Sequence, residues 1–141
     1  MSKAAVIYWS GTGNTEAMAN AVVEGAKAKG AEVSLFTADE FDASMLDALD
    51  AVAFGCPAMG AEVLEEDEFE PMFASCEGKL GGKRIALFGS YGWGDGEWMR
   101  SWEKDCTGDG AVFACDSVIC NEAPDDDALA SCRALGEGIA E

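Results

Sequence analysis

The sequence predicts an α/β fold, a doubly wound, five-stranded parallel sheet with helices on both faces. Two observations predict it. Short apolar segments alternate with amphipathic ones along the chain, a pattern typical of strand–helix–strand units. Neither a repeat nor a linker-like stretch interrupts this alternation, and 141 residues suit one domain with a substantial core. We therefore expect a single domain over residues 1–141.

Strands are predicted where apolar residues run on or alternate with polar ones. Ala4–Trp9 and Ala51–Gly55 are almost wholly apolar, as strands covered on both faces should be. Glu32–Thr37 alternates apolar and polar residues, which favours a place nearer the sheet edge. Arg84–Gly89 and Ala111–Cys120 are the predicted fourth and fifth strands.

Helices are predicted where apolar residues recur at helical spacing. The expected segments are Glu16–Lys29, a short one at Ser44–Leu49, Glu65–Leu80, Glu97–Cys106 and Asp125–Ala140. Gly30 suits the end of the first helix, and a run of three aspartates suits the positive start of the last. Trp98 and Trp102, four residues apart on one helix, are expected to pack in the core.

The charge of the chain limits its partners. Its 27 acidic and 9 basic residues give a net charge of −18, which argues against nucleic acid and anionic membrane surfaces and favours a basic protein partner. No apolar run approaches the roughly 20 residues that span a bilayer, and the N-terminus lacks a secretory pattern. We expect a cytoplasmic protein that does not bind membranes.

Metal chemistry and catalysis find little support in the sequence. The six cysteines form no C-x-x-C pair, and the chain has no histidine, so zinc and iron–sulfur spacings are absent. Reduced thiols that act as small buried hydrophobes are the expected state, with a disulfide framework as the alternative. No paired carboxylates and no nucleophile beside a base are recognisable, so we expect neither a metal site nor catalytic residues.

A small polar loop joins the first strand to the first helix. Its residues are Ser10, Gly11, Thr12, Gly13, Asn14 and Thr15. Three hydroxyl groups add donors, two glycines permit close backbone approach, and the start of a helix attracts an anion. The loop predicts a cradle for one terminal phosphate; an ordinary N-capped turn is the alternative.

Two common nucleotide motifs do not fit this loop. The P-loop pattern needs a lysine, and none occurs between Lys3 and Lys27. The dinucleotide pattern fails because Glu16 stands where the third glycine should be. Hydrolysis of a nucleoside triphosphate is therefore disfavoured, and a single phosphate remains the predicted ligand group.

Two further loops follow the third and fourth strands, whose carboxyl ends share one edge of a parallel sheet. The first contains Pro57, Ala58, Met59, Gly60, Ala61 and Glu62. The second contains Ser90, Tyr91, Gly92, Trp93 and Gly94. Large aromatics set among glycines have few neighbours to pack on, which favours stacking on a flat ligand ring. Trp9 is expected in the core or on the pocket floor, and Asn121 is a weaker candidate for the pocket.

The three loops resemble those of flavodoxins in their order and spacing, and the resemblance covers nearly the whole chain. It is closest to the short-chain group, which lacks the insertion that interrupts the last strand. The resemblance implies a flavodoxin-like sheet with strand order 2-1-3-4-5. It also implies non-covalently bound FMN at the carboxyl ends of the first and third strands.

The resemblance assigns roles to particular residues. The Gly60 peptide would turn so that its carbonyl accepts a hydrogen bond from the flavin N5–H, and Glu62 would accept one from N3–H. Met59 would flank the inner face of the ring and Trp93 the outer face, with Tyr91 as the second choice for stacking. Taken alone, Met59 also suits loop packing and Glu62 a solvated charge.

The resemblance further implies a low-potential one-electron carrier that cycles between semiquinone and hydroquinone and shuttles electrons between redox enzymes. Its acidic rim would dock on basic patches, those of ferredoxin-linked oxidoreductases included, and it would act as a monomer rather than as an enzyme. An FMN-dependent NAD(P)H quinone or flavin reductase of the same fold is the alternative. A phosphate-accepting receiver domain is a third class, disfavoured because Ser10–Thr12 replaces its acidic cluster.

Overall fold

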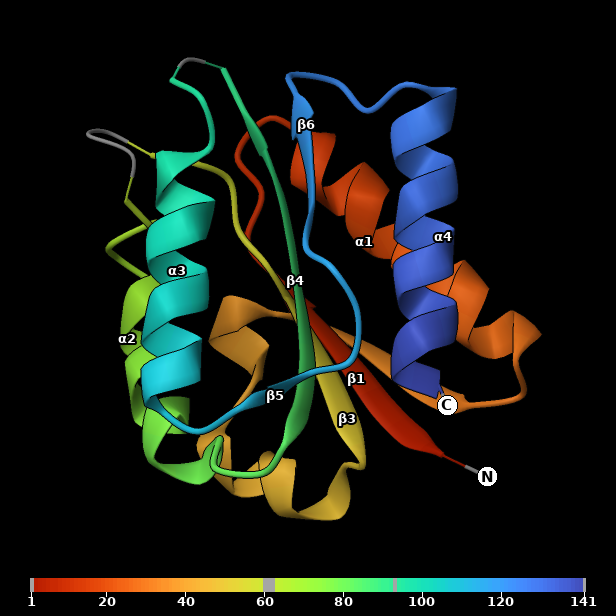
Figure 1. Ribbon diagram of the computed structural model, residues 1–141, viewed down its shortest axis with the longest axis vertical. Coiled ribbons are helices and arrows are strands. Elements are labelled where there is room, and N and C mark those ends of the chain that lie inside the picture. The colour runs from red at the N-terminus through yellow and green to blue at the C-terminus, as the bar shows by residue number, and fades with distance from the viewer. Residues whose placement is uncertain (1, 60–62, 93, 141) are drawn as a thin grey trace.

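A parallel sheet forms the centre of the protein in the computed structural model, which describes residues 2–59, 63–92 and 94–140. Its strands are β1 (Lys3–Tyr8), β2 (Glu32–Thr37), β3 (Ala51–Gly55), β4 (Arg84–Tyr91), β5 (Val112–Phe113) and β6 (Val118–Asn121). The order is β2-β1-β3-β4-β5, with β6 also paired to β4, and every pairing between strands is parallel (Figure 1). The predicted class and strand order are confirmed, with β2 at one edge.

The prediction of one continuous last strand is wrong. β5 pairs with the start of β4 and β6 with its end. The Ala114 N–H still donates to the Ile85 carbonyl of β4 at 2.8 Å, and residues 115–117 leave the ladder. Two contacts hold this departure. The Ser117 hydroxyl donates to Glu103 Oε2 at 2.7 Å, and the Cys115 thiol lies 3.9 Å from the Leu135 carbonyl oxygen. Tertiary contacts therefore override the apolar pattern here.

Helices cover both faces of the sheet (Figure 1). They are α1 (Asn14–Ala28), α2 (Phe69–Cys76), α3 (Glu97–Gly108) and α4 (Asp126–Ala140), with 3-10 turns η1 (Ala38–Glu40), η2 (Ala43–Ala48) and η3 (Glu77–Lys79). Helices α1 and α4 lie on one face and α2 and α3 on the other. The predicted helix over 65–80 is too long: α2 begins four residues later, and its last turn tightens into η3.

Two close backbone approaches join α1 to α4. A Cβ at Gly25 would lie 1.9 Å from the Arg133 carbonyl oxygen, and one at Gly136 would lie 2.0 Å from the Val22 carbonyl oxygen. Only glycine permits such contact between two helices. Helices α1 and α4 therefore lie closer together than they could with any larger residue at these two positions.

Aromatic side chains fill the layer between the sheet and the other two helices. Trp98 and Trp102 are 1% and 2% exposed, which confirms their predicted place in the core. The Trp102 ring meets Phe69 and Phe73 edge to face, with ring centroids 5.5 and 5.7 Å apart. The Trp98 indole N–H donates to the Cys56 carbonyl at 3.1 Å, tying α3 to the residue that follows β3.

The described residues contain no disulfide and no helix that could span a membrane. All six cysteines are free thiols, and four of them, Cys56, Cys76, Cys106 and Cys132, are buried. Among the described residues, the helices are too short or too polar for any of them to cross a bilayer.

Candidate functional site

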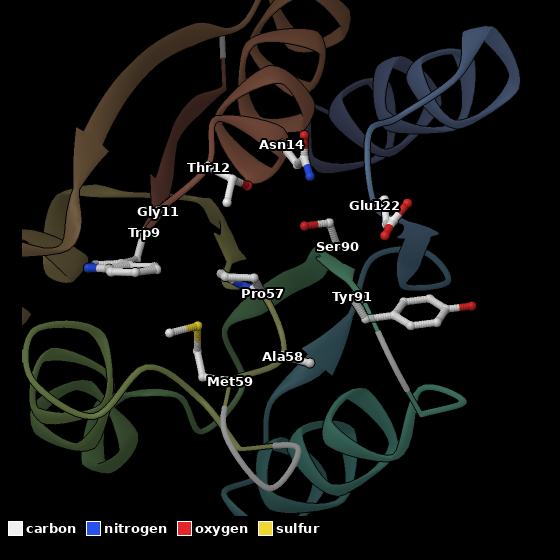
Figure 2. Close-up of a pocket in the computed structure, with 11 residues that line it drawn as sticks. Trp9, Gly11, Thr12, Asn14, Pro57, Ala58, Met59, Ser90, Tyr91 and Glu122 are labelled. Carbon is white, nitrogen blue, oxygen red and sulfur yellow. The ribbon is translucent and has the colours of Figure 1, made fainter.

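A cavity of about 360 Å³ opens at the carboxyl ends of β1, β3 and β4 (Figure 2). Its lining residues are Trp9, Gly11, Thr12, Asn14, Pro57, Ala58, Met59, Ser90, Tyr91, Gly92 and Glu122. Nine of these come from the three predicted loops. The strand order brings the loops together, because β1 and β3 are neighbours and their connections leave on opposite faces of the sheet.

The first loop folds back on itself before α1 begins. The Gly13 N–H donates to the Ser10 hydroxyl oxygen at 3.0 Å, and Gly13 adopts φ +95°, a conformation that favours glycine. Thr12 and Asn14 line the cavity. Thr15, expected beside the phosphate, is 1% exposed, and its hydroxyl lies 3.3 Å from that of Ser90. Its contact joins α1 to β4.

The second loop is held on both sides of its tip. The Ala58 N–H donates to the Ser90 carbonyl at 3.0 Å, which continues the pairing of β3 with β4. Met59 and Val63 then exchange two backbone hydrogen bonds of 2.8 and 2.9 Å, an antiparallel bridge. The predicted site residues between them, Gly60, Ala61 and Glu62, lie outside the described residues. Pro57, Ala58 and Met59 form one wall of the cavity.

The third segment is only partly a loop. Strand β4 runs on to Tyr91, so Ser90 and Tyr91 belong to the strand rather than to the predicted loop. The Tyr91 ring packs against Trp98, with centroids 5.5 Å apart, and points away from Pro57 in Figure 2. Gly94 adopts φ +79°. Trp93, the first choice for stacking, lies outside the described residues.

Two lining residues were not among the predicted site residues. Trp9 had been left between core and pocket, and it lines the cavity. Glu122 follows β6 with φ 58°, the one positive value among the described non-glycine residues, and its N–H donates to the Tyr91 carbonyl at 2.7 Å. Only its position after the last predicted strand could have indicated it. Asn121 donates to the same carbonyl at 3.4 Å and lines a neighbouring cleft.

Glu65 fixes the chain where the second loop meets α2. Glu65 is 6% exposed, and its carboxylate accepts the N–H groups of Asp67, Glu68 and Phe69 at 2.9, 2.7 and 2.8 Å. Burial acts to raise the pKa of the Glu65 carboxyl, but the three hydrogen bonds outweigh it and hold that pKa below its ordinary value. The helix start is thus stabilised by an ionised carboxylate.

A second, polar cavity of about 540 Å³ lies on the other side of Trp9. It is lined by Tyr8, Trp9, Ser10, Gly11, Gly13, Glu16, Thr37, Asp39 and Glu68. The Tyr8 hydroxyl donates to Glu16 at 3.1 Å, and burial together with this bond raises the pKa of Tyr8. Among the described residues no base lines either cavity, whereas four carboxylates do.

The smaller cavity suits a flat ring with a phosphate tail. At one end, the first turn of α1 presents N–H groups that have no partner within the helix. At the other end, Pro57, Ala58 and Met59 offer an apolar wall. Burial raises the pKa of the nearby Cys56 thiol to about 12, so this sulfur stays protonated and is not a nucleophile. The arrangement suits binding and orienting a ligand.

Comparison with known proteins gives one consistent result. The flavodoxin family model matches residues 6–136. A flavodoxin of Megasphaera elsdenii is 45% identical over 136 residues, covering 96% of this chain and 97% of the relative. One of Clostridium beijerinckii is 44% identical over 135 residues, with the same coverage.

Solved structures agree with the sequence matches. The solution structure of two-electron reduced Megasphaera elsdenii flavodoxin superposes with a TM-score of 0.90 at 44% identity, covering 97% of this chain and 98% of that one. A flavodoxin from the domain Archaea gives a TM-score of 0.86 at 30% identity, with 98% and 96% covered.

Proposed function

Because this chain belongs to the flavodoxin family, whose cofactor is FMN, we propose that it is a low-potential one-electron carrier. It holds FMN non-covalently, cycles between the semiquinone and hydroquinone forms, and passes electrons between redox enzymes. The observation that carries this proposal is the cavity itself, which joins the start of a helix to an apolar wall at the carboxyl ends of three parallel strands.

The residues around the cavity divide the task of binding. Thr12, Asn14 and the first N–H groups of α1 hold the phosphate through neutral donors, since no base is among the described residues that line the site. Met59 and Pro57 support the ring on one side. Trp93 and Gly60 keep the roles that the family resemblance gives them, as predictions.

The acidic surroundings favour a low potential. Bound FMN supplies the one-electron chemistry, and each fixed negative charge nearby makes a further electron less favourable. At about 10 Å and an effective dielectric constant of about 20, one charge costs roughly 1.7 kcal/mol, or about 70 mV for one electron. Glu122 lines the cavity, and Glu16, Asp39 and Glu68 line the adjoining polar cavity.

The same charges select the partner. A surface with an excess of acids attracts proteins that present lysine and arginine around their own redox centre. Ferredoxin-linked oxidoreductases of this kind are the proposed donors and acceptors, and the carrier meets them as a monomeric single domain in the cytoplasm.

Stepwise anaerobic reduction of the purified protein, followed by visible absorbance, tests this function. We expect the bands of oxidised flavin, then a long-wavelength radical band, then bleaching. Flavin that bleaches without the radical band, together with NADH or NADPH oxidation by the protein alone, would favour the two-electron reductase. A protein that takes up no added FMN would refute the proposal.

A further inference from the structure

Trp9 forms the wall between the two cavities described above. Its backbone N–H donates to the Gly55 carbonyl at 3.0 Å, so the residue continues β1 beside β3. Its indole lies over the first loop, Ser10–Thr15, which is the predicted phosphate loop. A Cβ at Gly11 would be 3.0 and 3.2 Å from two atoms of the indole ring. The ring lines both the cavity of about 360 Å³ and that of about 540 Å³. Its position therefore shapes the phosphate end of the site.

A carboxylate from a distant part of the chain holds this indole. The Trp9 Nε1–H donates to Glu68 Oε1 at 3.0 Å, across 59 positions of sequence. Figure 2 shows the indole nitrogen directed away from Pro57 and Met59, so the bond is made on the side opposite the ligand cavity. Glu68 therefore reaches the site through the ring and not by lining that cavity itself.

Glu68 is itself held in place. It occupies the N-cap position of α2, and its own N–H donates to the buried Glu65 carboxylate at 2.7 Å. The carboxylate that receives the indole N–H is thus fixed to the start of a helix. A chain of two hydrogen bonds runs from Glu65 to Glu68 and from Glu68 to the ring above Gly11.

We propose that Glu68 is a positioning residue for FMN, which acts by holding the Trp9 indole as the wall of the phosphate loop. This inference rests on the proposed function, because it names a determinant of affinity for the same cofactor. The carboxylate keeps the ring over Gly11, and the ring keeps the loop and the cavity in the shape that accepts the phosphate end of FMN.

If Glu68 acted only through its charge, replacing it would change the affinity for FMN in the opposite direction from the loss of a positioning contact. A carboxylate near the phosphate loop repels the phosphate anion, so removing it should tighten FMN binding, most of all at low salt. Losing a positioning contact should weaken binding instead. The sign of the change therefore separates the two roles.

Four variants make the test. Glu68→Ala removes the acceptor, Glu68→Gln keeps an acceptor oxygen without the charge, and Trp9→Phe keeps a ring without the N–H. Glu66→Ala is the matched control, because this exposed neighbour lines a different cleft between α2 and α3. The measurement is the Kd of the apoprotein for FMN, from quenching of flavin fluorescence, with Glu68→Ala also made in the Trp9→Phe background.

We expect Glu68→Ala to weaken FMN binding about fivefold, less than a buried hydrogen bond to a charged group would give, because this bond is exposed. Glu68→Gln and Glu66→Ala should leave the Kd unchanged or lower it. In the Trp9→Phe background Glu68→Ala should weaken binding no further. Tighter or unchanged binding by Glu68→Ala, or equal weakening in both backgrounds, would overturn the proposal.

The NMR signal of the Trp9 indole N–H, measured in the apoprotein, gives a readout that does not depend on FMN. It is assigned by its loss in Trp9→Phe and should shift and exchange faster with solvent in Glu68→Ala. An unchanged signal would also overturn the proposal. If wild-type protein binds no FMN, the proposed function fails together with this inference, whereas normal FMN binding with a silent Glu68→Ala refutes the positioning role alone.

Discussion

Replacing Glu65 should destabilise the protein more than replacing any of the exposed acids that follow it. In Glu65→Ala, the N–H groups of Asp67, Glu68 and Phe69 lose their common acceptor, and Phe69 is fully buried. Glu65→Gln is milder. Its amide oxygen keeps the two bonds made by Oε1, but its NH₂ group then faces the Asp67 N–H.

The expected magnitude follows from these contacts. Glu68 occupies the N-cap position of α2, but the Glu65 carboxylate acts as the capping side chain, because it accepts the N–H groups at the helix start. Loss of a capping side chain costs about 0.5–2 kcal/mol, and a hydrogen bond to a charged group contributes about 1.5–3 kcal/mol. Three bonds that share one carboxylate do not add in full, so we expect about 3 kcal/mol for Glu65→Ala and about half of that for Glu65→Gln. With a urea m-value of about 2 kcal/mol/M, the Glu65→Ala midpoint should fall by about 1.5 M.

Urea unfolding of the apoprotein, followed by far-ultraviolet circular dichroism, is the assay, with Glu66→Gln as the control. Glu66 is exposed, so that variant reports only the relief of repulsion among neighbouring acids. A Glu65→Ala protein within about 0.5 kcal/mol of wild type, the usual range for surface substitutions, would refute the capping argument.

The pH dependence gives a second check on Glu65. Its folded-state pKa is lowered below the unfolded value, so its stabilisation is present above the unfolded pKa and is lost as the pH falls through the folded one. The stability advantage of wild type over Glu65→Gln should therefore shrink on acidification below about pH 4. A constant advantage down to the acid transition would contradict an ionised cap.

Two further predictions concern other parts of the fold. Gly136→Ala should cost about 2–3 kcal/mol by forcing α4 from the Val22 carbonyl, whereas Gly108→Ala, with open space around it, should be neutral or stabilising in the same urea assay. Burial, the neighbouring Asp109 carboxyl and the charges of Asp105 and Glu70 raise the pKa of Glu77 to about 7. A raised folded-state pKa means stability is lost as the pH rises through it, so wild type should lose stability relative to Glu77→Gln from about pH 5 to 8.

Each of these has a contradicting result. Gly136→Ala with wild-type stability would mean that α1 and α4 can separate at little cost. A stability difference between wild type and Glu77→Gln that stays flat between pH 5 and 8 would mean that Glu77 is ionised throughout this range.

The class of fold, with helices on both faces of the sheet, could be predicted from the sequence. A strand that is buried on both faces is a run of apolar residues, and such a run can be recognised without knowing which elements pack against it. Ala4–Trp9 and Ala51–Gly55 are such runs. The strand order came with the family resemblance and not from any residue pattern. The gathering of the three loops then follows from that order.

Other features depend on contacts between distant residues, and no local pattern carries them. The break in the last strand depends on Ser117 meeting Glu103. The start of α2 depends on Glu65 turning its carboxylate inward, where spacing alone placed it inside the helix. Thr15 stays a prediction at the phosphate, and the 3.3 Å contact of its hydroxyl with that of Ser90, 75 positions along the chain, is one that no local pattern carries.

The break in the last strand also affects how the sheet meets other molecules of its own kind. A long, flat outer strand presents a row of unpaired N–H and C=O groups that invites another chain to add to the sheet. Here the outer row beside β4 consists of two strands of two and four residues, separated by residues 115–117, which leave the ladder and include Asp116. An incoming strand would find no continuous register along it, so the kink that interrupts the sheet also protects this edge against fibril-like growth.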